Sequence, residues 1–269
     1  MPTMNCDLLT QAYNVKIEER LKTIPTPLTL ATILTHDDPG SAEYQHYLSK
    51  DCKQLGIHHL AFQCENDTEL QEAIMHCNQS LDVNGILVFY PLGQHITLNK
   101  YNVANSVLAT KDVEGLHKEH IGSLEQSYDV NGIYPSTPKA IIELLTYYNY
   151  PFTGTATILN RSDVVGKPLR LMLEGKGMTV LAAYHKTSDE VVRDMLKDSD
   201  LIITAVPNNS YKLHSDMIKQ GAAVVAVNPN NIDEDELLGK CSLVTSRKSP
   251  IGRITRKVLL ENLLELQHR

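Results

Sequence analysis

A short loop between an apolar run and a helical segment constrains this chain more than any other feature. The run Thr155–Leu159 is apolar and partly β-branched, and Leu169–Leu173 has the character of a helix. The intervening residues 160–168 therefore predict a strand, a turned loop and the start of a helix. Such a loop offers backbone N–H groups and the positive end of a helix dipole to an anion. Arg161 and Ser162 add a permanent charge and a hydroxyl, as a pyrophosphate would require.

The patterns on both sides of this loop predict an α/β protein with parallel sheets. In the first half, apolar strands at 28–34, 59–64 and 85–90 alternate with helical spacing, which gives a βαβαβ order. The second half repeats this alternation and is Rossmann-like, because its phosphate loop follows its first strand. Its predicted strands are 156–159, 179–183, 201–204, 223–227 and 242–244, and its predicted helices lie around 168–174, 190–197, 215–219 and 233–238.

Composition excludes several classes of protein. The net charge of -7 argues against a nucleic-acid-binding face, which needs clustered Lys and Arg. No apolar run approaches the roughly 18 residues of a membrane span, and the first residues lack the pattern of a secretory signal. The five cysteines are widely spaced, which predicts neither a zinc site nor a disulfide framework. We therefore expect a cytoplasmic protein with reduced thiols and no bound metal.

Motifs along almost the whole chain resemble those of one enzyme family. Residues 160–168 read N-R-S-x-x-V-G-x-P, close to the G-R-S-x-x-V-G-x-P cofactor loop of the methylenetetrahydrofolate dehydrogenase/cyclohydrolase family. Further similar segments follow in the family's order: Ser41–Tyr44, Asn84–Leu92, Lys111–Leu116, Pro135–Pro138, Asp200–Val206, Gly252–Thr255 and Leu259–Asn262. The chain is therefore identified as a member of this family.

The resemblance implies two domains. Residues 1–137 would form an N-terminal parallel α/β domain that binds folate, and 138–255 a Rossmann-like domain that binds NAD(P). The last helix, within 256–269, would return to the first domain. A tetrahydrofolate derivative is the implied substrate, and a homodimer is the implied assembly.

Three substitutions fall on the family's substrate chemistry. The family's catalytic tyrosine aligns with Tyr44, but the lysine four residues later, about 40° away around the helix, is Leu48. The glutamine that orients this lysine aligns with Phe89, and the pterin-binding aspartate with Glu114. The resemblance implies catalytic roles for Tyr44 and Glu114. Its implied substrate contacts are Tyr44, Leu48, Phe89, Pro91, Leu92, Asp112, Glu114, Pro250 and Gly252.

These substitutions discriminate between the family's two activities. Cyclohydrolase action needs proton transfers that a positioned lysine supplies, and leucine offers no proton. Hydride transfer needs the substrate and cofactor rings held face to face. The sequence predicts an NAD(P)-dependent dehydrogenase with absent or weak cyclohydrolase activity, closest to the family's monofunctional NAD-dependent branch. The alternatives are a bifunctional enzyme and a non-catalytic folate- or nucleotide-binding paralogue, because Pro250 and Arg253 also depart from the family's glycine-rich loop.

The choice between NADP and NAD stays open in the sequence. His185 and Lys186 follow the second Rossmann strand, where NADP enzymes of the family have a serine and a base. Arg161 and Lys186 favour NADP, whereas the branch that the chain resembles uses NAD. The predicted cofactor contacts are Asn160, Arg161, Ser162, Val165, Gly166, Pro168, His185, Lys186, Thr187, Ala205, Val206, Pro207, Asn228 and Thr255.

Overall fold

The computed structural model describes residues 3–36, 38–126, 132–207, 209 and 211–268, and the chain forms two compact units. We call residues 13–136 and 256–269 the N-terminal unit, and residues 1–12 and 137–255 the C-terminal unit. Two helices, α1 (Asp7–Leu21) and α10 (Gly252–Leu266), each begin in the C-terminal unit and end in the N-terminal unit. The return of the last helix agrees with the expectation from the sequence.

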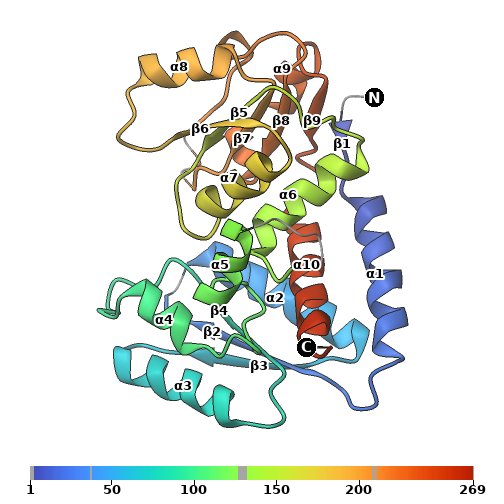
Figure 1. Cartoon of the computed structure of the whole chain (residues 1–269), viewed down its shortest axis with the longest axis vertical. Helices are drawn as coiled ribbons and strands as arrows, with labels where there is room; N and C mark the ends of the chain where they lie inside the picture. Colours follow the sequence, from blue (N-terminus) through green and yellow to red (C-terminus); the bar gives the residue numbers. More distant parts are fainter. Residues whose placement is uncertain (1–2, 37, 127–131, 208, 210, 269) are drawn as a thin grey trace. The chain divides into compact units, whose positions relative to one another are not determined.

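The N-terminal unit has a three-stranded parallel sheet in the order β3-β2-β4. Strands β2 and β4 are buried along their whole length, as expected for parallel strands covered on both faces. Helix α3 runs along this sheet (Figure 1). The elements are β2 (Thr29–Leu34), α2 (Pro39–Leu55), β3 (His58–Gln63), α3 (Asp67–Gln79), β4 (Gly85–Val88), α4 (Lys100–Ser106) and α5 (Lys118–Gln126).

Local sequence signals explain why α2 forms where it does. Asp38 is its N-cap, and its carboxylate accepts the N–H of Ser41 at 2.8 Å. Pro39 occupies the first turn, where its missing N–H costs nothing. Gly56 ends the helix in the left-handed region with φ 70°. These signals fix the start and the end of the helix that carries Tyr44.

The C-terminal unit has a six-stranded parallel sheet in the order β1-β9-β8-β7-β5-β6. The chain leaves β5 to one side through β6 and returns to the other side through β7, so the strand order reverses between β5 and β7. The elements are β1 (Thr3–Met4), α6 (Ser136–Tyr147), β5 (Thr155–Leu159), α7 (Gly166–Gly175), β6 (Thr179–Ala183), α8 (Asp189–Lys197), β7 (Leu201–Thr204), η1 (Ser215–Met217), β8 (Ala223–Ala226), η2 (Pro229–Asn231), α9 (Glu234–Leu238) and β9 (Leu243–Thr245).

Two details differ from the expectation. The sequence assigned residues 1–137 to the first domain, but residues 1–12 belong to the C-terminal unit, because Thr3 and Met4 pair with Val244 and Thr245 of β9. This pairing adds a sixth strand to the five that the sequence predicted. The helix expected at 215–219 is a single 3₁₀ turn, and it ends at Met217. Among the described residues, no helix is both long enough and apolar enough to cross a bilayer.

Candidate active site

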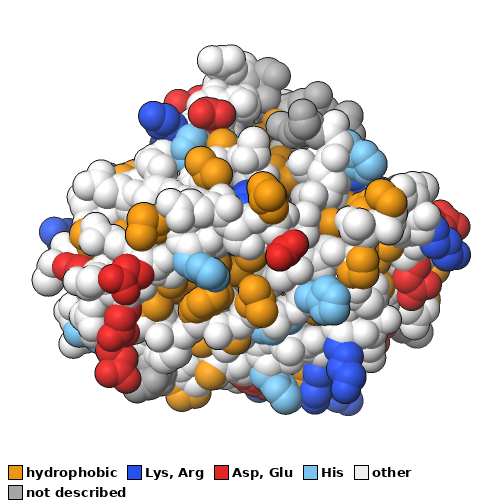
Figure 2. All heavy atoms as spheres, turned by 90° about the horizontal axis from the view of Figure 1, so that it is seen from below, with side chains coloured by type: hydrophobic (Ala, Val, Ile, Leu, Met, Phe, Trp, Pro, Cys, Tyr) orange, Lys and Arg blue, Asp and Glu red, His pale blue; other side chains and the backbone are white. Residues whose placement is uncertain are grey.

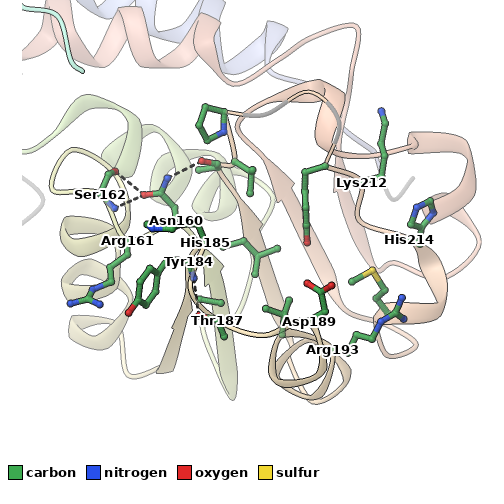
Figure 3. Close-up of a pocket in the computed structure, with 18 residues that line it drawn as sticks. Asn160, Arg161, Ser162, Tyr184, His185, Thr187, Asp189, Arg193, Lys212 and His214 are labelled. Carbon is green, nitrogen blue, oxygen red and sulfur yellow. Dashed lines mark hydrogen bonds between the residues drawn. The ribbon is translucent and has the colours of Figure 1, made fainter. Parts of the chain in front are cut away.

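A cavity of about 1060 Å³ lies in the C-terminal unit at the carboxyl ends of β5, β6 and β7 (Figure 3). It includes the point between β5 and β7 where the strand order reverses. Ligands of open α/β sheets bind at such a reversal, and this volume matches that of cofactor pockets. The cavity is lined by Leu159, Asn160, Arg161, Ser162, Ala183, Tyr184, His185, Thr187, Asp189, Val192, Arg193, Ala205, Val206, Pro207, Tyr211, Lys212, His214 and Met217.

Asn160 organises the loop that follows β5. Its Oδ1 accepts hydrogen bonds from the N–H of Ser162 at 2.8 Å, the hydroxyl of Ser162 at 2.7 Å and the N–H of Gly166 at 3.1 Å. Its Nδ2 donates to the carbonyl of Ala205 beyond β7 at 2.8 Å. A Cβ at Gly166 would lie 2.4 Å from the Asn160 carbonyl oxygen, so only glycine fits there. The loop therefore has one fixed shape, bonded to the strand on the other side of the reversal.

Cationic side chains lie at both ends of the cavity. The guanidinium of Arg161 lies 4.7 Å from the centre of the Tyr184 ring. Lys212 and His214 lie at the other end (Figure 3). Arg193 also lines the cavity and pairs with Asp216 at 3.3 Å. The lining thus offers several cationic groups and one carboxylate, Asp189, which suits an anionic dinucleotide.

The structure brings together most, but not all, of the predicted cofactor residues. Asn160, Arg161, Ser162, His185, Thr187, Ala205, Val206 and Pro207 line the cavity. Lys186 does not: its side chain is exposed at the turn after β6. Thr255 is buried in α10, where its hydroxyl contacts the Ile251 carbonyl. The remaining residues do not line the cavity: Val165, Gly166 and Pro168 are at the start of α7, and the side-chain amide of Asn228 donates to the Val206 carbonyl at 3.2 Å.

Several lining residues were missed by the sequence reasoning. Tyr184 follows β6 directly, and the rule that ligands bind at strand ends could have found it. Asp189 and Arg193 are four residues apart on α8, so they share one face of that helix. Tyr211 and Lys212 lie in the connection after β7, where they end a V-P-x-x-x-Y-K pattern that begins at Val206.

In the N-terminal unit, Tyr44 and Phe89 pack edge to face with ring centroids 5.9 Å apart. Tyr44 comes from α2 and is half-buried, and Phe89 directly follows β4. Burial raises the pKa of the Tyr44 phenol well above its usual range, and the nearby Glu114 adds to the rise. Tyr44 therefore keeps its proton and can act as a hydrogen-bond donor.

Leu48 is not presented to a ligand. It is 0% exposed and belongs to a hydrophobic core cluster that includes Cys52, Leu87 and Phe89. The expectation that Leu48 contacts the substrate is therefore corrected, because its side chain faces the core. Lys50, six residues after Tyr44 on α2, is exposed, and its amine lies over the Tyr47 ring at 5.5 Å.

Asp112 shapes the loop that carries Glu114. Its buried carboxylate accepts the N–H groups of Glu114 at 3.1 Å, Gly115 at 3.0 Å and His117 at 2.7 Å. Asn262 of α10 holds the same loop through its Nδ2, which donates to the Val113 carbonyl at 2.9 Å. The Asp112 oxygens are used by the loop itself, so Asp112 positions Glu114, whereas the sequence had placed it in contact with the substrate.

Glu114 is a buried carboxyl group with an unusual pKa. Its side chain accepts a hydrogen bond from the Ser136 hydroxyl at 2.8 Å. Burial raises the pKa of Glu114 to about 8, with a further contribution from the neighbouring charge of Asp112, while the Ser136 hydrogen bond acts in the opposite direction. A carboxyl group with a shifted pKa beside a tyrosine is typical of a functional site.

The remaining predicted substrate residues lie in two segments, one after β4 and one at the start of α10. In the N-terminal unit, Pro91 is exposed and Leu92 half-buried after a cis peptide bond between Tyr90 and Pro91. Pro250 and Gly252 belong to the C-terminal unit. Their loop is tethered there by Asp7, whose carboxylate accepts the Ser249 hydroxyl at 2.7 Å and the guanidinium of Arg253 at 2.6 Å. Arg253, which departs from the family pattern, thus has a structural partner in this chain.

Comparison with known proteins agrees with both units. The family described as tetrahydrofolate dehydrogenase/cyclohydrolase, catalytic domain, matches residues 4–114, and its NAD(P)-binding domain matches residues 135–269. The bifunctional protein FolD of Campylobacter hominis is 32% identical over 275 residues, covering 95% of this chain and 94% of that protein. The same protein from Caldicellulosiruptor saccharolyticus is 31% identical and covers 91% of this chain and 92% of its own length.

Solved structures show the same fold. The crystal structure of FolD from Campylobacter jejuni is 30% identical, covers 99% of each chain and gives a TM-score of 0.87. The NAD-dependent 5,10-methylenetetrahydrofolate dehydrogenase of Saccharomyces cerevisiae is 24% identical, covers 100% of this chain and 98% of its own, and gives a TM-score of 0.86, which supports the fold alone.

The two curated relatives are bifunctional, so the comparisons support the family and not the monofunctional branch that the sequence resembled. The two family matches cover most of the sequence, and a relative is 32% identical along 95% of the chain. This protein therefore belongs to the tetrahydrofolate dehydrogenase/cyclohydrolase family.

Proposed function

We propose that this protein oxidises 5,10-methylenetetrahydrofolate to the 5,10-methenyl form with NAD(P), and that it lacks appreciable cyclohydrolase activity. One observation carries the proposal. Leu48 occupies the position of the family's catalytic lysine and is fully buried in the core, while the C-terminal unit has a cavity lined by the predicted cofactor loop. The chain thus keeps the machinery for hydride transfer and has lost the amine that would move protons.

Each remaining group has a role in this reaction. When bound, the nicotinamide accepts the hydride, so the protein has only to bind and orient the substrate. The Glu114 carboxylate accepts hydrogen bonds from pterin N–H groups, and Tyr44 bounds the site on the side of the p-aminobenzoate. The loop shaped by Asn160 holds the pyrophosphate, together with the start of α7.

Turnover is tested with purified protein, methylenetetrahydrofolate and each nicotinamide in turn. The proposal expects reduction of the cofactor in proportion to the amount of protein. Binding of folate and nicotinamide without any reduction would instead support the non-catalytic paralogue, and the absence of both binding and reduction would contradict the proposal.

We propose that NADP binds more tightly than NAD, through Arg161. Arg161 lines the cavity beside Tyr184, whereas Lys186 does not line it. Hydrogen bonds to a charged phosphate contribute about 1.5–3 kcal/mol. Arg161→Gln is therefore expected to raise the KM for NADP about 10- to 100-fold and to leave that for NAD nearly unchanged. Lys186→Gln is the matched control and should change neither. An equal loss for both cofactors in Arg161→Gln would contradict this assignment.

We also propose that the protein is a homodimer formed through β3. This strand is an edge of its sheet, and among the described residues it pairs only with β2. Leu60 of β3 is 41% exposed, and Met75 and Leu81 are exposed nearby in the sequence. Figure 2 views the face that carries β3 and α3, where hydrophobic side chains lie among histidines. Proteins normally cover or block the unpaired edge of a sheet. A second copy of this chain can cover the β3 edge by isologous pairing.

The dimer is tested by sedimentation of the wild type and of Leu60→Lys. The variant is expected to shift the protein to a monomer at micromolar concentration. Leu108→Lys changes an equally exposed leucine outside β3 and should sediment like the wild type. A monomeric wild type, or a Leu60→Lys dimer of unchanged strength, would contradict the proposal.

A further inference from the structure

The hydroxyl of Tyr90 is buried without a hydrogen-bond partner among the described residues. Its ring is half-buried and packs against the core cluster that includes Ile33, Val88 and Ile96. Buried tyrosine hydroxyls normally find a partner, because leaving one unpaired costs free energy. An unpaired buried hydroxyl in a native site therefore suggests that a ligand or a water completes it.

The register of the sheet places Tyr90 and Glu114 at the same edge of the sheet. Tyr90 lies just past the end of β4, whose Val88 is level with Ile33 of β2. The segment before Glu114 runs parallel to β4, because Ile86 is bridged to Asp112 and the Ile86 N–H donates to the backbone carbonyl of Lys111 at 2.7 Å. This segment carries Glu114 toward the same carboxyl edge of the sheet as Tyr90.

The electrostatics agree with this proximity. Burial raises the pKa of the Tyr90 phenol well above its usual range, and the negative charges of Asp112 and Glu114 raise it further. The phenol therefore stays protonated and is available as a donor. Both ring nitrogens of His36, which follows the adjacent strand β2, are also buried without a partner among the described residues. The edge thus offers more than one unused polar group to a ligand.

The Glu114 carboxyl group and the Tyr90 hydroxyl match the hydrogen-bonding groups along one edge of a pterin. That edge presents an amino group and a ring N–H, which are donors, followed by the 4-oxo group, which is an acceptor. Glu114 supplies acceptor oxygens, and Tyr90 supplies a donor. We propose that the Tyr90 hydroxyl donates a hydrogen bond to the 4-oxo group of the substrate's pterin while Glu114 binds the two N–H groups beside it. This inference rests on the proposed folate substrate.

The test compares tetrahydrofolate with its 4-amino counterpart, in which a donor replaces the acceptor at position 4 and the neighbouring ring nitrogen carries no hydrogen. Calorimetric titration of the wild type is expected to show tighter binding of the 4-oxo ligand. Tyr90→Phe keeps the ring and removes the hydroxyl. It is expected to weaken the 4-oxo ligand about tenfold, as for one lost hydrogen bond, and to leave the 4-amino ligand unchanged or tighter.

Two further measurements separate this role from a structural one. Because the hydroxyl has no partner within the described residues, Tyr90→Phe should keep or raise the temperature of thermal unfolding. Tyr101→Phe, on the exposed surface of α4, is the matched control and should bind both ligands like the wild type.

The outcomes distinguish this inference from the proposed function. If Tyr90→Phe leaves the ratio of the two affinities unchanged while the wild type binds both ligands, the inference is wrong and the proposed function stands. If the wild type binds neither ligand, the proposed folate substrate itself is wrong.

Discussion

Replacing Leu48 with lysine is expected to lower the free energy of unfolding by about 3 kcal/mol or more and to give no cyclohydrolase activity. Leu48 is 0% exposed within the cluster that contains Cys52 and Phe89. An unpaired ammonium group in such a core costs several kcal/mol. Both oxygens of the nearest acid on α2, Asp51, are already paired, one with Arg256 at 2.7 Å and the other with Lys257 at 2.9 Å.

Urea unfolding measures this effect, with Leu48→Met as the control. Methionine conserves the volume of leucine, so that variant should lose less than about 1.5 kcal/mol. The absence of hydrolysis in Leu48→Lys follows from Phe89, which cannot orient an amine as the family's glutamine does. A Leu48→Lys protein as stable as the wild type would show that position 48 opens to solvent or to the substrate, contrary to its burial here.

Replacing Glu114 with alanine is expected to lower kcat/KM for methylenetetrahydrofolate on the order of 100-fold. Two hydrogen bonds to a charged carboxylate, each at the lower end of the range of about 1.5–3 kcal/mol, give this factor. The KM for the nicotinamide should stay nearly unchanged, because Glu114 belongs to the N-terminal unit and lies outside the cofactor cavity. Steady-state kinetics with each substrate varied in turn checks both parts, and a loss confined to the cofactor's KM would contradict the assignment.

The raised pKa of Glu114 predicts how kcat/KM for folate depends on pH. The pKa of Glu114 is raised to about 8 by burial, so the group is protonated and neutral below that pH and becomes a full acceptor above it. The kcat/KM for folate should therefore rise as the pH increases through about 8. Ser136→Ala removes the hydrogen bond that lowers this pKa and should shift the rise to higher pH. In Glu114→Gln, this limb of the profile should disappear.

The same pKa shift predicts how stability depends on pH. A carboxyl group whose pKa is higher in the folded than in the unfolded state makes folding less favourable as it ionises. The contribution of Glu114 to stability is thus largest below its ordinary pKa and declines as the pH rises toward about 8. Glu114→Gln should be less sensitive to pH over that range.

Much of the fold could be predicted because parallel buried strands are nearly continuous apolar runs. Strands β5, β6 and β7 fall within one residue of their predicted ranges. Strand β1 was missed because two residues carry no periodicity and their partner, β9, is far away in the sequence. Helix α1 gave no signal either, since its apolar residues do not share one face: Leu8 and Val15 are exposed on it.

The candidate site was less accessible to sequence reasoning. Motif spacing identified the loop of Asn160 and the segment that carries Glu114, because the residues within each motif are close together in the sequence. Whether Leu48 faces the core or the substrate depends on packing against β4 and α10, which a helical pattern does not specify. That the Tyr90 hydroxyl has no partner among the described residues is likewise a property of the folded chain.

Dehydrogenase activity without cyclohydrolase activity can be tested in one reaction that follows two products. Purified protein is mixed with methylenetetrahydrofolate and NADP or NAD, and absorbance reports the reduced cofactor and the methenyl product together. Methenyltetrahydrofolate is expected to accumulate mole for mole with the reduced cofactor and then to decay at the rate seen in buffer alone. Decay of the methenyl product that accelerates with added protein, by roughly 100-fold or more as general acid–base catalysis would give, would contradict this expectation.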